Sequence, residues 1–380
     1  MEFELTEGMR AVQEAARAVA EKEIRPVVMK YDESQEFPYP IIAVLSGLGF
    51  MGMTWPEDLG GAGLTDLEAT VIIEELARVD PSVALTVASH NSLCSGHIML
   101  FGNEEQRRRY IPDLATGRKL GAWALTEPGS GSDSGGMQTI AERDRTGWIL
   151  NGTKTFITQG SVGSTYVVMA LTDRSGGKRS ITAFVLEREV PGFSVGKKEN
   201  KLGMRSSDTA TLLFENVRVP EEDVLGTVGE GFKQALRVLD GGRIGIAALS
   251  VGIAQGALEA SLKYAKERHQ FGKPLAEFQA IQWKLADMAT EIAAARLLTY
   301  RAAALKVRGE PFALAASHAK YFASECATRA TNDAVQIHGG YGFTKDFPVE
   351  KLYRDVKLMT IGEGTSEVQK MIIARHLVGR

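Results

Sequence analysis

The chain has 380 residues, of which 44% are hydrophobic and 24% are charged, and its formal net charge at pH 7 is -3. These values are typical of a globular protein with room for two or three domains, and they exclude a disordered or fibrous chain. The small net charge gives no electrostatic reason to expect a nucleic acid or an anionic membrane as partner.

The start of the chain alternates acidic and basic residues in a helical pattern and lacks the apolar run of a signal peptide. No stretch approaches the ~18 uninterrupted apolar residues of a membrane span. The two cysteines, Cys94 and Cys326, suit reduced thiols better than a disulfide framework. We therefore expect a cytoplasmic protein that does not cross a membrane.

Residues 1–120 are rich in alanine, leucine and glutamate at helical spacing, which predicts an N-terminal helical domain. Thr65 and Glu68 have the spacing of a capping box before an apolar helix, and Asp80-Pro81 is expected to end that helix. The stretch WPEDLGGAG at 55–63 predicts a loop between helices.

Residues 121–228 change in texture and predict a middle all-β domain, as a small barrel or packed sheets. Strand-like runs occur at 166–169, 181–185 and 211–214. The residues 148–158 predict a β-hairpin, because Asn151-Gly152 suits the positive φ angles of a type I′ turn.

Long helical patterns return in residues 229–380 and predict a C-terminal four-helix-bundle domain. One buried stripe runs from Ile281 to Ala295 at steps of three and four, and residues 313–337 repeat the pattern. The fold class is therefore α+β, with an all-β domain between two helical ones.

Near the C-terminus, residues 361–369 read IGEGTSEVQ and place one carboxylate, Glu363, between two glycines. Ser366 and Gln369 have capping-box spacing, so Glu363 is expected on a loop just before a helix. Gly362 and Gly364 allow unusual backbone angles and the close approach of a ligand. By itself, the pattern also fits an ordinary exposed turn glutamate.

Two other stretches are open to functional and structural interpretations. The segment WALTEPGSGSD at 123–133 forms a turn whose N–H and hydroxyl groups, including those of Thr126, Ser130 and Ser132, suit an anion or a heterocycle, although an ordinary loop also fits. In LDGGRIGIA at 239–247, Arg243 suits a phosphate or carboxylate, or is an exposed arginine near a helix start. Judged from residue type alone, Phe156 would be a core residue.

The six histidines lack zinc-site spacing, so no metal site is predicted.

Seven motifs occur in order along the chain: WPEDLGG, WALTEPGSGSD, NGTKTFIT, LDGGRIG, ERHQFGKP, QIHGGYG and YRDVKLMTIGEGTSEVQ. Together they resemble the acyl-CoA dehydrogenase family, and its short-chain or butyryl-type branch most. The resemblance implies FAD-dependent α,β-dehydrogenation of a short (or medium or branched short) acyl-CoA to the trans-2-enoyl-CoA. It also implies electron transfer to electron-transferring flavoprotein and a homotetramer built as a dimer of dimers.

The resemblance also assigns roles to residues. Glu363 is the implied catalytic base. Some members carry the base at the position of Gly242 and lack a glutamate at the position of Glu363, whereas this chain has glycine at the first position and glutamate at the second. Ala84 stands where glutaryl-type members carry an arginine, which disfavours a dicarboxyl substrate. Implied substrate-binding residues are Ser132, Asp240, Arg243 and Gly364. Implied cofactor-binding residues are Trp123, Leu125, Thr126, Gly131, Ser132, Phe156, Ile157, Thr158, Arg268, Phe271, Gln279, Gln336, Ile337, Gly339, Gly340, Thr365 and Glu367, and those between 266 and 343 come from a neighbouring subunit.

Two alternative functions remain. An acyl-CoA oxidase shares the first half of the reaction and returns electrons to oxygen, but the long C-terminal extension usual in that group is not seen. A non-catalytic FAD-containing relative that binds nucleic acid is disfavoured by the charge balance and by Glu363.

Overall fold

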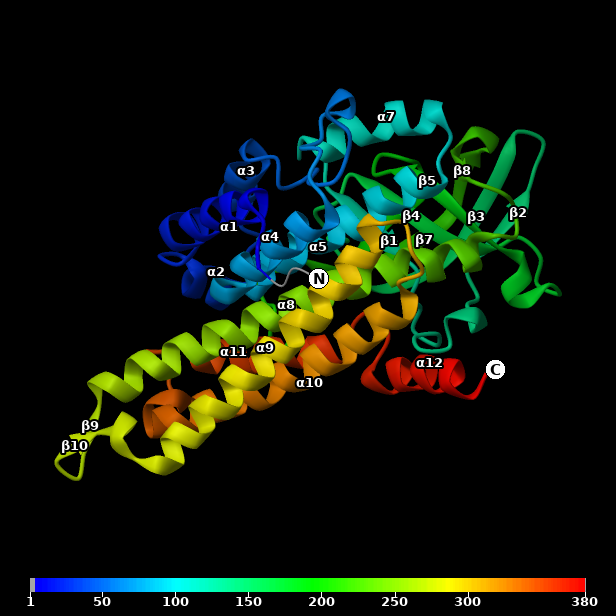
Figure 1. Cartoon of the computed structure of the whole chain (residues 1–380). Coiled ribbons are helices and arrows are strands. Elements are labelled where there is room, and N and C mark those ends of the chain that lie inside the picture. Colours follow the sequence, from blue (N-terminus) through cyan, green and yellow to red (C-terminus); the bar gives the residue numbers. More distant parts are fainter. Residues whose placement is uncertain (1–3, 380) are drawn as a thin grey trace.

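The computed structural model describes residues 4–379 as helices, a β-sheet part and helices again (Figure 1). This order confirms the predicted α+β class with an all-β part between helical ones. Thr65 and Glu68 form the predicted capping box, and the helix that they start ends before Asp80. The helices of the first part are α1 (Glu7–Val19), α2 (Val28–Ser34), α3 (Tyr39–Gly47), α4 (Asp66–Val79), α5 (Pro81–Ser89), α6 (Gly96–Phe101) and α7 (Glu104–Ala115).

The middle part is a mixed sheet with the strand order β6-β7-β3-β2-β4-β5-β8, and β1 pairs in parallel with β4. The three predicted strand runs lie within β4, β5 and β7. Every residue of β4 is buried, because Tyr166 and Val168 pack on one face of the sheet and Val167 and Met169 on the other. The strands are β1 (Gly121–Ala124), β2 (Ile140–Arg143), β3 (Gly147–Thr158), β4 (Thr165–Leu171), β5 (Ile181–Glu187), β6 (Phe193–Lys198), β7 (Thr209–Pro220) and β8 (Val224–Leu225).

The predicted hairpin at Asn151-Gly152 is wrong, because β3 runs through it as one strand. A Cβ at Gly152 would lie 2.4 Å from Oγ1 of Thr139, so the glycine serves close packing instead of a turn. Asn151 exchanges hydrogen bonds with Asn216 of β7 at a shift in the strand register. The residue types that favour a tight turn also suit such a bulge.

The C-terminal part contains the long helices α8, α9 and α10, which lie side by side in Figure 1. Helix α10 packs against α8, α9 and α12, and a small hairpin joins α8 to α9 at the far tip. The most apolar window of α8 is 78% buried, so α8 is a core helix of this fold. The elements are α8 (Gly231–Glu267), β9 (His269–Gln270), β10 (Lys273–Pro274), α9 (Gln279–Val307), α10 (Ala313–His338), α11 (Val349–Asp355) and α12 (Ser366–Val378).

Helix α8 joins the two helical parts by packing closely on α4. A Cβ at Gly252 would lie 2.3 Å from the carbonyl oxygen of Glu74, and one at Gly256 would lie 2.3 Å from that of Arg78. Residues four apart share a helix face, so the two glycines together let the backbones approach. This contact fixes the helix that carries Gly242 and Arg243.

Gly252→Ala should therefore lower the free energy of unfolding by about 1–3 kcal/mol, because the new methyl group meets a backbone carbonyl. The expected direction is opposite to helix propensity, which favours alanine by about 1 kcal/mol. Gly245→Ala is the matched control, since its Cβ would meet only Ala88 at 3.7 Å. Urea unfolding followed by circular dichroism measures both, and equal stability of the two variants would contradict the close contact.

Candidate active site

Glu363 lies in the turn that precedes α12, as the sequence predicts. Its φ is +53° and that of Gly364 is +92°, a left-handed backbone that a glutamate rarely adopts. Oε2 of the carboxylate is buried without a hydrogen-bond partner, and the backbone N–H has no acceptor among the described residues. An exposed turn glutamate is therefore the wrong interpretation. An unpaired buried oxygen beside a free donor indicates a place for a ligand.

The carboxylate of Glu363 points at α8. A Cβ built on Gly242 would lie 1.9 Å from Oε2 of Glu363 and 3.2 Å from a methyl carbon of Leu93. Leu93 lies on the π-helical turn His90–Ser95 between α5 and α6. The position where some members of the resembled family carry a base therefore faces the same point as Glu363. Only the absence of a side chain at Gly242 leaves room for the carboxylate in this position.

Two buried cations act on the carboxylate. Burial raises the pKa of Glu363 to about 7, and the charges of Arg243 and Lys320 act in the opposite direction. Arg243 is buried within α8, so the interpretation as an exposed arginine near a helix start is wrong. Its Nη1 donates to Asp240 at 2.6 Å, while its Nε is buried with no hydrogen-bond partner in the described part of the chain. A carboxyl group that titrates near neutral pH suits a general base.

The turn is tied to the helix that follows it, although α12 begins differently from the prediction. Thr365 is the N-cap, and its side-chain oxygen accepts the N–H three residues on. Ser366 is instead the first helical residue, and threonine and serine are both good caps that spacing alone does not separate. The amide of Gln369 donates to the carbonyls of Glu363 and Gly364 at 3.4 and 3.0 Å.

A buried ion pair supports the turn at residues 126–133, which the sequence predicts to line a cofactor. Lys154 of β3 donates to Glu127 at 2.8 Å and to the carbonyl of Leu125 at 3.0 Å, and both charged side chains are buried. Glu127 also accepts the backbone N–H groups of Gln138 and Thr139. The base of the turn is thus rigid, and a charge-assisted network of this kind positions backbone donors accurately.

The polar groups on this turn differ in their access to solvent. Gly131 and Ser132 are exposed, and Thr126 is half-buried. Ser130 is buried and donates its hydroxyl to the carbonyl of Asp133 at 2.6 Å, so the expectation of a free Ser130 donor is wrong. The available donors lie on the outer part of the turn.

Trp123 precedes the turn on β1 and is half-buried. Its indole N–H donates to Nδ1 of His97 at 3.0 Å, and the other ring nitrogen of His97 contacts Gln234 at 3.0 Å. Burial lowers the pKa of His97 to about 4, so this histidine is neutral and structural. Among the described residues, no group of three or more histidine, cysteine or acidic side chains is placed to hold a metal ion.

Phe156 projects outward from β3 beside this turn. Its side chain is 65% exposed and its φ is +56°, so the interpretation as a core residue is wrong. The adjacent Thr155 N–H donates to the carbonyl of Thr126 at 2.9 Å, which joins the strand to the turn. Ile157 is buried and offers only its backbone, and Thr158 is half-buried. An exposed ring in a constrained backbone is suited to stacking on a heterocycle.

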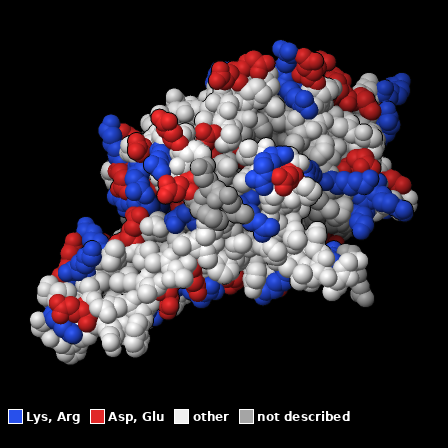
Figure 2. All heavy atoms as spheres, in the orientation of Figure 1, with Lys and Arg blue, Asp and Glu red and all other residues white. Residues whose placement is uncertain are grey.

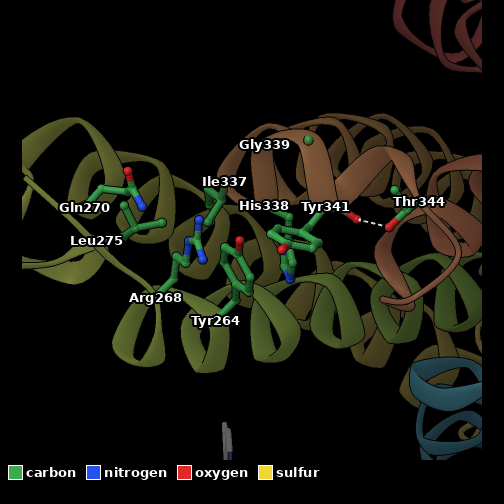
Figure 3. A pocket seen from close by; sticks show the side chains of 10 residues that line it. Tyr264, Arg268, Gln270, Leu275, Ile337, His338, Gly339, Tyr341 and Thr344 are labelled. Carbon is green, nitrogen blue, oxygen red and sulfur yellow. Dashed lines mark hydrogen bonds between the residues drawn. The ribbon is translucent and has the colours of Figure 1, made fainter.

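Of the other predicted cofactor residues, Thr365 and the exposed Glu367 lie at the start of α12. The rest lie towards the other end of α8, where Figure 3 shows Arg268, Ile337 and Gly339 around a pocket. Arg268 and Tyr341 face a pocket of about 540 Å³, and the guanidinium carbon of Arg268 lies 5.5 Å from the centre of the tyrosine ring. Phe271 is 93% exposed on the connecting hairpin. The predicted residues that line the pocket are Arg268, Ile337, Gly339 and Gly340, while Gln279 and Gln336 are exposed on the neighbouring helices.

These two sets of residues do not meet within one chain. Gly242, beside Glu363, and Arg268, just after α8, are 26 residues apart along one helix. At about 1.5 Å per residue this spans about 39 Å. Figure 1 shows the connecting hairpin at the tip far from the sheet. The structure therefore brings together Glu363 and Gly242, and separately Phe156 and the turn beside it, but leaves the Arg268 pocket distant.

Family models for the N-terminal, middle and C-terminal domains of acyl-CoA dehydrogenases match residues 6–118, 122–217 and 229–378. A short-chain-specific acyl-CoA dehydrogenase of Clostridium acetobutylicum is 45% identical over 98% of this chain and 99% of its own. The solved butyryl-CoA dehydrogenase of Megasphaera elsdenii is 45% identical, with a TM-score of 0.98 and 100% of both chains covered. A chain from a solved structure described as "Electron transferring flavoprotein of Acidaminococcus fermentans" is 46% identical, with a TM-score of 0.99 and 100% of both chains covered.

The three-part fold is that of an oxidoreductase that acts on a CH–CH bond. The chain belongs to the acyl-CoA dehydrogenase family.

Proposed function

We propose that this enzyme dehydrogenates a short acyl-CoA at the α,β position with bound FAD and with Glu363 as the base. The observation that carries the proposal is the unpaired, buried Oε2 of Glu363 in the space left by Gly242. The short-chain-specific and butyryl-CoA names of two full-length relatives support the choice of substrate class.

Residues of this chain account for the proton transfer. Glu363 takes the α-proton of the thioester onto Oε2, and its free backbone N–H is a donor for the thioester oxygen, on which negative charge develops. The charge of Arg243 favours the ionised carboxylate that accepts the proton. FAD, when bound, accepts the β-hydrogen as hydride. For binding of the acyl-CoA substrate we propose contacts with Ser132, Asp240, Arg243 and Gly364.

The residues on the sheet fit a flavin. Phe156 offers an exposed ring, and the exposed Gly131 and Ser132 lie on a turn whose base is held rigid. Thr126 and Thr158 add half-buried hydroxyl groups. We propose that these groups hold the isoalloxazine half, together with backbone groups of Trp123, Leu125 and Ile157 and the α12 residues Thr365 and Glu367.

The Arg268 pocket belongs, in this proposal, to the cofactor of a second copy. The support is its distance of about 39 Å along α8 from Gly242. Phe271 at 93% exposure and Trp283 at 64% present apolar surface near the same tip, and Figure 2 shows a broad area without charged groups over the long helices. We propose a homotetramer, a dimer of dimers, in which each cofactor site combines two subunits.

For the electron acceptor, we propose electron-transferring flavoprotein. A near-superimposable chain described with the electron transferring flavoprotein of Acidaminococcus fermentans supports this choice. Oxygen as acceptor would make the enzyme an oxidase instead. Reducing the enzyme anaerobically with butyryl-CoA and then admitting air separates the two, because rapid formation of peroxide would favour the oxidase.

The substrate class is tested by a chain-length series. Butyryl-CoA should bleach the flavin about tenfold or more faster than octanoyl-CoA or palmitoyl-CoA, because a pocket that is too short rejects each added methylene. A methyl carbon of Leu93 would lie 3.2 Å from a Cβ at Gly242, close to the carboxylate of Glu363, so Leu93→Ala should shift the preference towards longer chains. Fastest bleaching by palmitoyl-CoA in the unaltered enzyme would contradict the short-chain assignment.

The rate of flavin reduction by butyryl-CoA should rise with pH through about 7, the pKa to which burial raises Glu363. The rate rises with pH because only the ionised carboxylate accepts a proton, and lower pH protonates the carboxylate. Stopped-flow bleaching between about pH 5.5 and about pH 8.5 measures this limb. A rate that does not change over this range would contradict Glu363 as the titrating base.

A further inference from the structure

Lys320 is a fully buried charged residue that the proposed reaction does not directly use. It lies on α10, and its ammonium donates to the carbonyl of Gly364 at 2.7 Å, one residue after the proposed base. The same carbonyl already accepts from the amide of Gln369 at 3.0 Å. A neutral donor therefore serves this carbonyl, so the buried charge on Lys320 needs another explanation.

The charges around this ammonium come from four elements. Burial lowers the pKa of Lys320 to about 8, and the carboxylate of Glu363 acts against that effect. In the other direction, Lys320 and Arg243 counter the burial that raises the pKa of Glu363. The charged groups that act on Lys320 are Glu363 in the turn, Arg243 on α8, Glu325 on α10 and Glu367 on α12.

The backbone at this point needs support. Glu363 and Gly364 are consecutive left-handed residues, an arrangement that persists only when neighbouring groups hold it. Lys320 reaches this segment from α10, and Gln369 reaches it from α12. The carbonyl of Gly364 is thus clamped from two sides, and the clamp fixes the direction of both the Glu363 side chain and its N–H.

We propose that Lys320 is a positioning residue, which holds the left-handed turn through Gly364 and whose charge favours the ionised form of Glu363. The inference rests on the proposed role of Glu363 as the base. It does not require Lys320 to touch the substrate or the cofactor.

The test compares Lys320→Met with Lys320→Gln, which keeps a donor but removes the charge. In the flavin-loaded enzyme, the acid limb of flavin bleaching by butyryl-CoA should move up by about one pH unit in both variants, so that the rate at pH 7 falls about fivefold. At alkaline pH the glutamine variant should be faster than the methionine variant, because it retains the hydrogen bond. Lys357→Met, at an exposed position shortly before the turn, is the control and should match the unaltered enzyme.

An acid limb that stays in place in either folded variant would overturn the electrostatic role. Loss of folded, flavin-loaded protein in both variants would overturn it too, since Lys320 would then be required for the fold itself. Failure of the proposed function has a different signature. In that case the unaltered enzyme would not bleach with any acyl-CoA, or Glu363→Gln would remain active.

Discussion

Glu363→Gln is expected to slow the bleaching of the flavin by butyryl-CoA by about 10²-fold or more. The amide has nearly the shape of the carboxylate but cannot accept the α-proton. Oε2 is buried and has no hydrogen-bond partner among the described residues, so its replacement by an NH₂ group removes the proposed base without breaking a hydrogen bond at that atom. Flavin content, read from the visible spectrum, should stay near that of the unaltered enzyme.

The control for this variant is Glu105→Gln, which changes an exposed glutamate on α7. It should leave both the flavin spectrum and the bleaching rate unchanged. The Glu363→Gln variant should still bind butyryl-CoA, because its contacts with CoA remain. The change that bound butyryl-CoA causes in the flavin spectrum measures this binding. A bleaching rate within about threefold of normal would contradict the assignment of the base.

Gly242→Ala should lower the same rate by about 10²-fold while leaving the protein folded. The new Cβ would lie 1.9 Å from Oε2 of Glu363, so the carboxylate must move, and misplacement of a base by about 1 Å costs about this factor. Stability should not fall in parallel, because the clashing carboxylate is the end of a flexible side chain and alanine favours the helix by about 1 kcal/mol.

Gly245→Ala separates this effect from a general change in α8. It lies on the same helix one turn further on, and its Cβ would make only an ordinary contact with Ala88. Thermal unfolding should be similar for the two variants, whereas only Gly242→Ala should lose activity. Equal bleaching rates would show that the carboxylate does not occupy the space above Gly242.

Much of the fold could be predicted because the residue patterns are local. The capping box at Thr65 and the three strand runs needed only spacing and residue type. The hairpin at Asn151 failed because a glycine that suits a turn also suits close packing, and only the position of Thr139 distinguishes them. The predicted N-cap of α12 was wrong by one residue, because Thr365 and Ser366 are chemically equivalent as caps.

The site was predicted less completely than the fold. The position of Glu363 on a turn before α12 could be predicted from its flanking glycines, and its proposed role as base comes from the resemblance of its motif. The buried lysines Lys154 and Lys320, which support the site, could not be predicted from the sequence. Lysine is rarely fully buried, so its sequence position alone indicates an exposed residue. Glu127 lies inside a quoted motif, yet its pairing with Lys154 depends on the packing of β3 beneath the turn. The burial of such charges follows from tertiary contacts that spacing does not reveal.

The most direct measurement of the central claim is exchange of the α-hydrogen in D₂O. Butyryl-CoA is incubated anaerobically with the flavin-loaded enzyme, and deuterium at each carbon is followed by mass spectrometry and NMR. A base at Glu363 predicts deuterium at the α-carbon with the unaltered enzyme and about 10²-fold slower incorporation with Glu363→Gln. Equal incorporation by the two proteins would show that another group removes the proton.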